Sequence, residues 1–241
     1  MVSSIAQFQI KPIGAELHLF GIDISFNNSA LFMIIATILV SAFLTQSVKS
    51  SYTIPNRIQS LAEMTYEFTT KIVSENVGIE GMAYFPLIFS LFMFILAGNL
   101  LGILPYAYTF TSQIIVTFAI SIAIFLGITV IAIIKHGTKF FRFFLPSGTP
   151  VYMAPLLIPI EILSYLSRPI SLSVRLFANM VAGHTMMKVF GGFVISLGAA
   201  GFVPLLFLVA LTAFEVLVAV LQAYVFTIIT CIYLSDALYL H

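Results

Sequence analysis

Apolar residues form long stretches of this chain, and the few charged positions mark where the stretches end. No charged residue lies between Asp23 and Lys49, and Ala30–Leu44 is almost continuously apolar. About 20 helical residues cross about 30 Å of hydrocarbon. The pattern therefore predicts a first membrane-spanning helix over 28–48.

The next segment, 55–77, is amphipathic. One face of a helix over this segment would carry Ile58, Leu61, Thr65, Phe68 and Ile72, and another face would carry Glu63, Glu67, Lys71 and Glu75. Two such faces predict a helix that lies on the membrane surface or under another subunit. A solvated loop helix is the alternative.

The uncharged run from Met82 to Ile134 is too long for one crossing. It is interrupted near its middle by Gly102, Pro105, Tyr106 and the polar residues 109–113. Because glycine, proline and polar clusters end helices, this region (84–135) predicts a hairpin of two helices near 84–104 and 112–135.

The final region, 152–239, continues in helical apolar sequence but contains internal charges. It predicts two long helices over 152–190 and 202–239, joined by a turn from Gly191-Gly192 to Gly201. The first is too long for a perpendicular crossing, so it should be strongly tilted or bent, with Pro169 as a candidate bend. The chain is thus expected to be an all-α membrane protein, a single membrane domain over 1–241, with about five transmembrane helices, one surface helix and two long tilted C-terminal helices.

Composition agrees with this prediction. Hydrophobic residues make up 61% of the 241 positions and charged residues 8%, whereas a soluble domain carries about 25% charged residues. An ordinary soluble domain is therefore excluded.

The net charge of +1 argues against nucleic acid as a partner. The single cysteine, Cys231, forms no intrachain disulfide. The first 20 residues lack a signal-peptide pattern, so we expect the mature protein to begin near Met1.

Basic residues gather on two of the predicted connections. Lys49, Arg57 and Lys71 follow the first span, and Lys135, His136, Lys139 and Arg142 follow the hairpin. By the positive-inside rule both groups should face the cytoplasm or its mitochondrial equivalent, which places the N-terminus outside.

Charged and titratable side chains recur inside the C-terminal helices: Glu161, Arg168, Arg175, His184, Lys188, Glu215 and Asp236. A charge at the bilayer centre costs at least about 2.5–3.5 kcal/mol, so these groups should face protein, water or each other. A seven-residue interval, which returns to nearly the same helix face, separates Glu161, Arg168 and Arg175 and recurs between Glu215 and Gln222. The two stripes predict the walls of a hydrated path.

Ordinary structural roles compete with this interpretation at several positions. Arg168 and Lys188 could extend toward an interface, Glu161 and Asp236 could lie in water at the membrane edge, and Asn99 could make a structural hydrogen bond.

Arg175 has no acidic residue within four positions, so its partner should lie on another helix or another chain. His184 lies nine residues further on, about 13 Å along an ideal helix and nearly on its opposite side. The titratable pair His184 and Glu215 on consecutive membrane helices favours proton handling.

The run from Arg168 to His184, RPISLSVRLFANMVAGH, resembles the signature of subunit a of the F-type ATP synthase, the stator channel subunit of the Fo sector. The resemblance extends to 214–228, to 98–106 and to 233–238, and so covers nearly the whole chain. With histidine on the first helix and glutamate on the second, the sequence is similar to the alphaproteobacterial and mitochondrial arrangement.

The resemblance implies a rotary proton channel with two offset half-channels at the interface with a ring of c subunits. The family's polar positions fall on Arg175, His184, Glu215, Gln222, Asn179, Glu161 and Asp236. Arg175 corresponds to the essential arginine, His184 and Glu215 to the outer half-channel, and Glu161 to the inner one. The correspondence is weaker at Asp236.

The resemblance also implies partners and a location. The partners are the c-ring, peripheral-stalk b-type subunits, the remaining ATP synthase subunits and membrane lipid, in an energy-transducing inner membrane. No cofactor or metal is expected. The chain should not be an enzyme by itself, since it has no HExxH, Gly-x-Ser-x-Gly or phosphate-loop motif.

Two other classes of function remain as alternatives, a secondary antiporter and a non-catalytic scaffold subunit. An antiporter should show repeated halves with broken helices, whereas the functional charges here crowd into the C-terminal half. A scaffold would have no use for Arg175 unpaired in its own helix. Sodium as the coupling ion also stays open, although a histidine–glutamate pair suits protons better than a hard cation.

Overall fold

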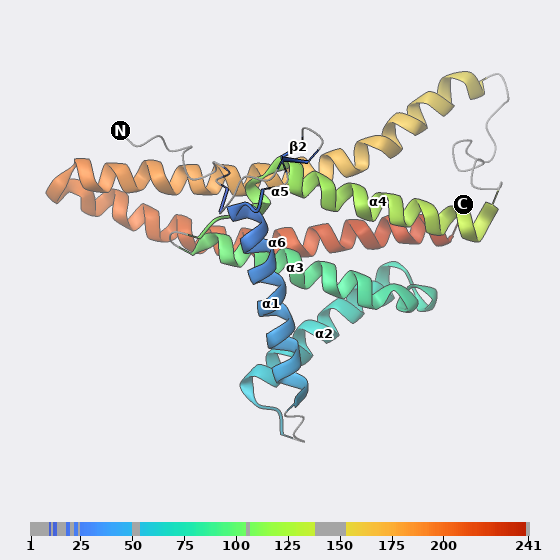
Figure 1. Cartoon of the computed structure of the whole chain (residues 1–241), viewed down its shortest axis with the longest axis horizontal. Coiled ribbons are helices and arrows are strands. Elements are labelled where there is room, and N and C mark those ends of the chain that lie inside the picture. The colour runs from blue at the N-terminus through green and yellow to red at the C-terminus, as the bar shows by residue number, and fades with distance from the viewer. Residues whose placement is uncertain are drawn as a thin grey trace.

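The computed structural model describes residues 10, 12–13, 18–19, 22–23, 25–49, 54–104, 107–137 and 153–239. Within these residues, five helices are long and apolar enough to cross a membrane. The predicted all-α membrane fold is therefore confirmed. A two-residue antiparallel strand pair, His18–Leu19 (β1) with Ile22–Asp23 (β2), precedes the helices. Figure 1 shows the long helices grouped on one side and α1 with α2 projecting from them.

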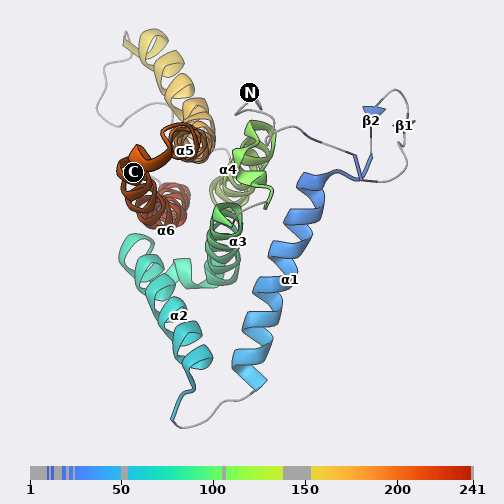
Figure 2. The same cartoon turned by 90° about the vertical axis from the view of Figure 1, so that its left-hand side faces the viewer.

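The first two helices form a V that opens toward the rest of the protein (Figure 2). Helix α1 spans Asn28–Lys49, where 28–48 was expected. Helix α2 spans Arg57–Asn76, within the expected 55–77, and Asn56 caps it by accepting a hydrogen bond from the Arg57 amide. One face of α2 is buried through Thr69 and Val73, so this helix packs against the bundle as well as presenting a charged face.

The hairpin consists of α3, Phe85–Ile103, and α4, Ile114–His136. A short 3-10 helix, Ile79–Tyr84 (η2), leads into it, and another, Phe110–Ser112 (η3), lies in the connection. Phe110 is fully packed against α3 because Gly98 has no side chain, and a Cβ there would lie 2.4 Å from the Phe110 ring. Of the predicted helix breakers, Pro105 and Tyr106 lie outside the described residues.

The last two helices are the longest, α5 over Ala154–Ser196 and α6 over Phe202–Leu238. They lie side by side and run across the direction of α1 (Figures 1 and 2). Helix α5 continues through Pro159 and Pro169, and its first part is angled away from the remainder. The angle within α5 agrees with the expectation that a helix of its length is tilted or bent.

The turn expected to begin at Gly191-Gly192 was wrong. Helix α5 runs through both glycines to Ser196, and the chain reverses over Gly198–Gly201 (η6). A helix-interior glycine costs only about 1 kcal/mol relative to alanine. Packing offsets that cost, because the Phe190 ring on α5 stacks on the Phe207 ring of α6 with 5.3 Å between centroids.

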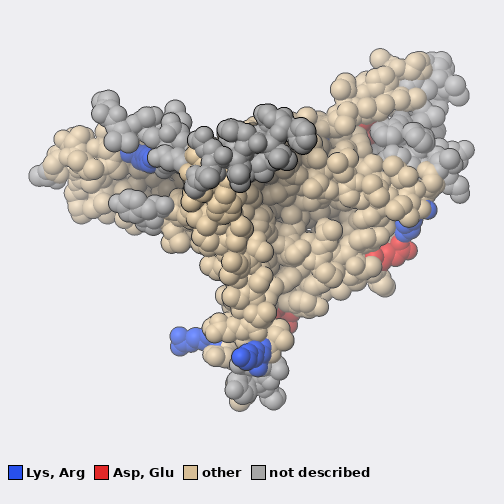
Figure 3. Space-filling view, in the orientation of Figure 1, with Lys and Arg blue, Asp and Glu red and all other residues tan. Residues whose placement is uncertain are grey.

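The second basic connection begins at the end of α4. Lys135, at the end of α4, forms an ion pair with Glu80 in η2, and His136 lies 3.0 Å from the Ala237 carbonyl oxygen. Lys139 and Arg142 lie outside the described residues. Uncharged residues cover most of the face in Figure 3, and charged side chains gather mainly toward its lower and right-hand ends.

Candidate functional site

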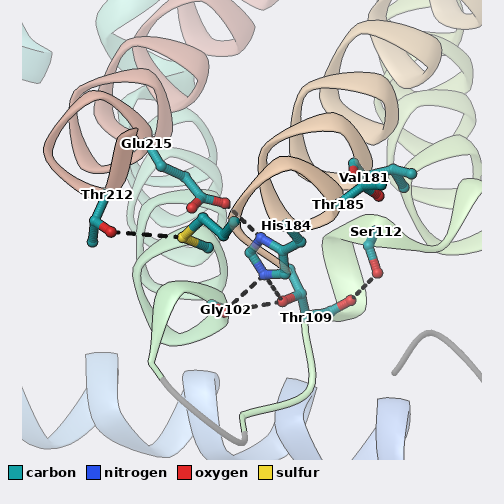
Figure 4. Close-up of polar contacts among 9 residues, drawn as sticks. Gly102, Thr109, Ser112, Val181, His184, Thr185, Thr212 and Glu215 are labelled. Atoms are coloured by element: carbon teal, nitrogen blue, oxygen red, sulfur yellow. Dashed lines mark hydrogen bonds and ion pairs between the residues drawn. The ribbon is translucent and has the colours of Figure 1, made fainter. Parts of the chain in front are cut away.

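The centre of the candidate site is a contact between His184 on α5 and Glu215 on α6. The Nδ1 atom of His184 lies 2.5 Å from Oε1 of Glu215 (Figure 4). Each residue is 6% exposed, so this titratable pair lies in the interior, between two apolar helices. The two side chains named in the sequence as a titratable pair are therefore in direct contact.

Gly183 permits this contact. A Cβ at Gly183 would lie 2.8 Å from Oε1 of Glu215, closer than side chains tolerate. The glycine immediately before His184 therefore lets α6 bring its carboxylate against the imidazole. Sequence reasoning had not assigned Gly183 a role, although it lies inside the RPISLSVRLFANMVAGH run.

The other ring nitrogen of His184 contacts the α3–α4 hairpin. Nε2 lies 2.9 Å from the carbonyl oxygen of Gly102 and 2.7 Å from Oγ1 of Thr109. The Thr109 hydroxyl also donates to the Gly102 carbonyl at 3.2 Å. Three segments distant in sequence thus meet at one imidazole (Figure 4). Thr109 was predicted only as part of a helix-breaking polar cluster.

Gln222 lies two turns along α6 from Glu215 and contacts Asn179 of α5. The Asn179 amide donates to Oε1 of Gln222 at 2.9 Å. Among the described residues, Nε2 of Gln222 and Oε2 of Glu215 are buried without a hydrogen-bond partner. Buried polar atoms of this kind are usually satisfied by ordered water.

Arg175 lies one turn before Asn179 on α5, and its environment is the opposite of that of His184. Arg175 is exposed, together with apolar neighbours such as Val174 and Ile170, whereas His184 is buried. No acidic group in the described part of the chain forms an ion pair with Arg175. The guanidinium thus faces outward from a helix that spans the membrane.

A second contact between α5 and α6 lies on the other side of Arg175. Nη1 of Arg168 donates to Oδ2 of Asp236 at 3.0 Å. The guanidinium also lies over two aromatic rings, at 4.9 Å from the centroid of Tyr233 and 5.5 Å from that of Tyr165. Arg168 and Asp236 thus hold each other, with side chains that stay 20% and 37% exposed, so a position at the membrane edge remains a prediction for both.

Comparison with known proteins identifies the chain's relatives. The sequence model of the family described as ATP synthase A chain matches residues 30–235. The chain is 54% identical to ATP synthase subunit a of Pelagibacter ubique, over 98% of this chain and 97% of that protein. It is 52% identical to the proteins of the same name from Rhodospirillum rubrum and Paramagnetospirillum magneticum, over 100% of this chain and 100% of each relative.

The chain belongs to the ATP synthase A chain family. The resemblance seen in the sequence is confirmed, with alphaproteobacterial relatives. An ATP synthase A chain is a multi-pass membrane protein that associates with other ATP synthase subunits, and it is not the catalytic subunit. The antiporter alternative is thereby removed.

The other polar residues singled out in the sequence lie apart from the His184–Glu215 contact. Glu161 is partly buried on α5 and forms no ion pair with another described residue, and Lys188 is exposed. Asn99 is fully buried, and its amide donates to the Ala219 carbonyl of α6 at 3.2 Å. The structural hydrogen bond considered for Asn99 is therefore present. The described residues contain no group of His, Cys, Asp and Glu arranged to hold a metal ion.

Proposed function

We propose that this chain translocates protons through two offset half-channels at the interface with a c-ring and so couples the proton-motive force to rotation and ATP synthesis. One observation carries the proposal. Arg175 is exposed on an apolar face of α5, while the titratable pair His184 and Glu215 is buried away from that face. A permanent charge and a proton-exchanging pair are thus kept apart on the same two helices.

The physical argument begins with the rotor. A carboxylate on a c subunit is too costly to ionise in lipid, so it crosses the bilayer protonated. Opposite a fixed guanidinium the ionised form is favoured, and the carboxyl releases its proton there. Arg175 suits this position because an arginine side chain keeps its charge and cannot pass a proton on. It would keep the two aqueous paths from meeting.

The outer half-channel would include His184 and Glu215, with Asn179 and Gln222 continuing toward the rotor. On α5, Asn179 lies between His184 and Arg175, and it is hydrogen-bonded to Gln222 of α6. The pair lies nearer the α5–α6 turn than Arg168 and Asp236 do. We assign this half-channel to the side opposite the Lys135 end, which places the N-terminus outside.

The inner half-channel would pass Glu161, which forms no ion pair with another described residue. Asp236 was a second candidate for the path, and we now propose that it borders the same end. Its carboxylate is held by Arg168, so proton exchange there is assigned to Glu161.

The partners follow from the exposed surfaces. Large apolar side chains on the outer face of α5 and α6, such as Val174, Met186, Phe214 and Leu217, are more than 40% exposed. We propose that the c-ring covers this face and that peripheral-stalk b-type subunits hold the chain stationary in an energy-transducing inner membrane. An exposed apolar face of this kind marks an interface with protein or lipid.

The test compares two arginines of one helix, Arg175→Lys and Arg168→Lys, in vesicles that contain the assembled ATP synthase. Lysine keeps the charge but is compact, flexible and able to lose its proton when desolvated. Arg175→Lys should abolish coupled ATP synthesis, whereas Arg168→Lys should retain most of it. Equal, near-normal synthesis by both variants would refute the proposal.

A further inference from the structure

The two nitrogens of the His184 ring have partners of different chemistry. Nδ1 faces a carboxylate oxygen of Glu215, which can accept or donate a proton. Nε2 faces the backbone carbonyl of Gly102, which can only accept a hydrogen bond. Because a carbonyl oxygen cannot donate, the contact of Nε2 with Gly102 is a hydrogen bond only when Nε2 carries the hydrogen.

Thr109 completes the environment of Nε2. Its hydroxyl donates to the Gly102 carbonyl and so turns a lone pair toward the Nε2 hydrogen (Figure 4). Gly102 lies in the last turn of α3, where carbonyl groups lack helical partners and the helix dipole favours positive charge. Both acceptors therefore stabilise a protonated ring.

Thr109 is held firmly in this place. It is 4% exposed, and Ser112 donates its hydroxyl to the Thr109 carbonyl at 2.6 Å. On the other side, a Cβ at Gly102 would lie 2.6 Å from Oγ1 of Thr109, so only glycine allows the close approach.

We propose that Thr109 is a positioning residue which, with the Gly102 carbonyl, retains the Nε2 hydrogen of His184, so that protons pass through the Glu215 carboxyl and not through the imidazole ring. The proposal rests on the proton-channel function proposed above. A path through the ring would require Nε2 to release its proton. The carbonyl cannot take that proton, and the Thr109 hydroxyl already directs its own hydrogen to the same carbonyl.

The proton balance is then simple. A hydronium ion in the outer path gives a proton to the Glu215 carboxylate and becomes water. Oε2 of Glu215, which has no partner among the described residues, is the free position for this exchange. The hydrogen between Nδ1 of His184 and Oε1 stays in place throughout. Release of the Oε2 proton toward the rotor returns the carboxylate to its starting state, and Nε2 still carries its hydrogen.

The pH dependence of this exchange belongs to the His184–Glu215 pair. Glu215 faces the ring from α6, Gly102 from α3 and Thr109 from the connection, and Glu215 is the titratable group of these three. Lys188, one turn further along α5, is exposed.

The experiment replaces Thr109 by valine, which keeps its shape and removes its hydroxyl. ATP synthesis and ATP-driven proton pumping are measured against outer pH in vesicles with the whole complex. Thr109→Val should keep its maximal rate within about threefold of the unmodified protein. Its outer pH of half-maximal rate should fall by about one unit, because the protonated pair loses a hydrogen-bond acceptor. Thr109→Ser should restore the profile. Thr185→Val, which removes a hydroxyl that donates to the Val181 carbonyl of its own helix, should not shift it.

Two results would overturn the inference. A loss of tenfold or more at every pH in Thr109→Val, with Thr109→Ser normal, would show that protons pass through the ring to Thr109. An unshifted profile would show that Thr109 does not position the ring.

If Thr109→Val does not assemble, His184→Gln decides. Its amide can donate to the Gly102 carbonyl but cannot carry a proton, so flux should be reduced yet measurable, whereas a path through the ring would give none. Arg175→Lys in the same vesicles separates the two proposals, because normal synthesis in that variant counts against the channel function itself.

Discussion

Two pairs of an acidic and a basic side chain join α5 to α6, one on either side of Arg175, and they differ in chemistry. His184 and Glu215 form a buried pair, 6% exposed each, in which both side chains can accept and release a proton. Arg168 and Asp236 form a pair that is partly exposed to solvent, with side chains 20% and 37% exposed. Its guanidinium also lies over the Tyr233 and Tyr165 rings.

The difference indicates a division of labour along the same two helices. An arginine in an ion pair keeps its charge, so the contact between Arg168 and Asp236 is permanent and holds α5 against α6. A histidine and a glutamate can share one proton between them, so their contact can change its charge state without breaking. We therefore assign anchoring to the first pair and proton exchange to the second.

The largest effect should come from making the exchanging pair permanent. His184→Arg would fix Glu215 as a carboxylate, and coupled ATP synthesis should fall by about 100-fold or more, the scale of losing general acid–base function. The converse variant, Arg168→His, should keep synthesis within about threefold. ATP synthesis by vesicles under an imposed proton gradient measures both. Similar losses in the two variants would remove the distinction between the pairs.

A smaller loss should follow from Gly183→Ala. The added Cβ would lie 2.8 Å from Oε1 of Glu215, so the carboxylate has to move away from His184. We expect synthesis to fall about tenfold while the complex assembles normally, since the displaced atom is the end of a flexible side chain. Proton pumping per assembled complex is the measurement, and an unchanged rate would show that direct contact is not required.

Asp236→Asn should act on stability more than on transport. It leaves the Arg168 guanidinium with a neutral partner at a partly exposed site, which should lower the free energy of unfolding by about 1–2 kcal/mol. Breaking a fully buried pair costs more, about 3–5 kcal/mol. Thermal denaturation of the purified complex should begin at lower temperature, with proton pumping within about twofold. A loss of pumping as large as in His184→Arg would place Asp236 in the path.

The smallest effect is expected at Gly191. No atom lies within 4 Å of a Cβ built there, and the residue is inside a helix. Gly191→Ala should leave transport unchanged and raise stability by up to about 1 kcal/mol, because alanine favours helix. The same thermal denaturation assay tests this variant, and a clear destabilisation would contradict the continuous helix.

The positions of α1, α3 and α4 could be predicted because charge-free stretches define them, and those of α5 and α6 because helical apolar sequence continues past their charges. The contacts between α5 and α6 could have been predicted more fully than they were. Residue numbers in the three pairs, Arg168 with Asp236, Asn179 with Gln222 and His184 with Glu215, add up to nearly the same value. This relation is approximate for antiparallel helices, so the expected His184–Glu215 pair already implied that Arg168 faces the last turns of α6, although it did not single out Asp236.

The contacts of the hairpin with His184 could not be predicted in this way. Thr109 lies 75 positions from His184, and its place depends on two local facts that no periodic pattern reveals. Phe110 packs where Gly98 lacks a side chain, and Thr109 packs where Gly102 lacks one. The turn misplaced at Gly191-Gly192 has a similar cause, since side-chain packing outweighed the weak preference of glycine.

Passive proton flux through Arg175→Ala tests the central claim most directly. Vesicles with the assembled complex are given an imposed proton gradient, and proton leakage and ATP synthesis are measured together, with Arg168→Ala as the matched control. The account predicts that Arg175→Ala leaks protons and makes no ATP, because no permanent charge then keeps the two half-channels apart, whereas Arg168→Ala stays coupled. Normal ATP synthesis by Arg175→Ala in proton-tight vesicles would contradict it.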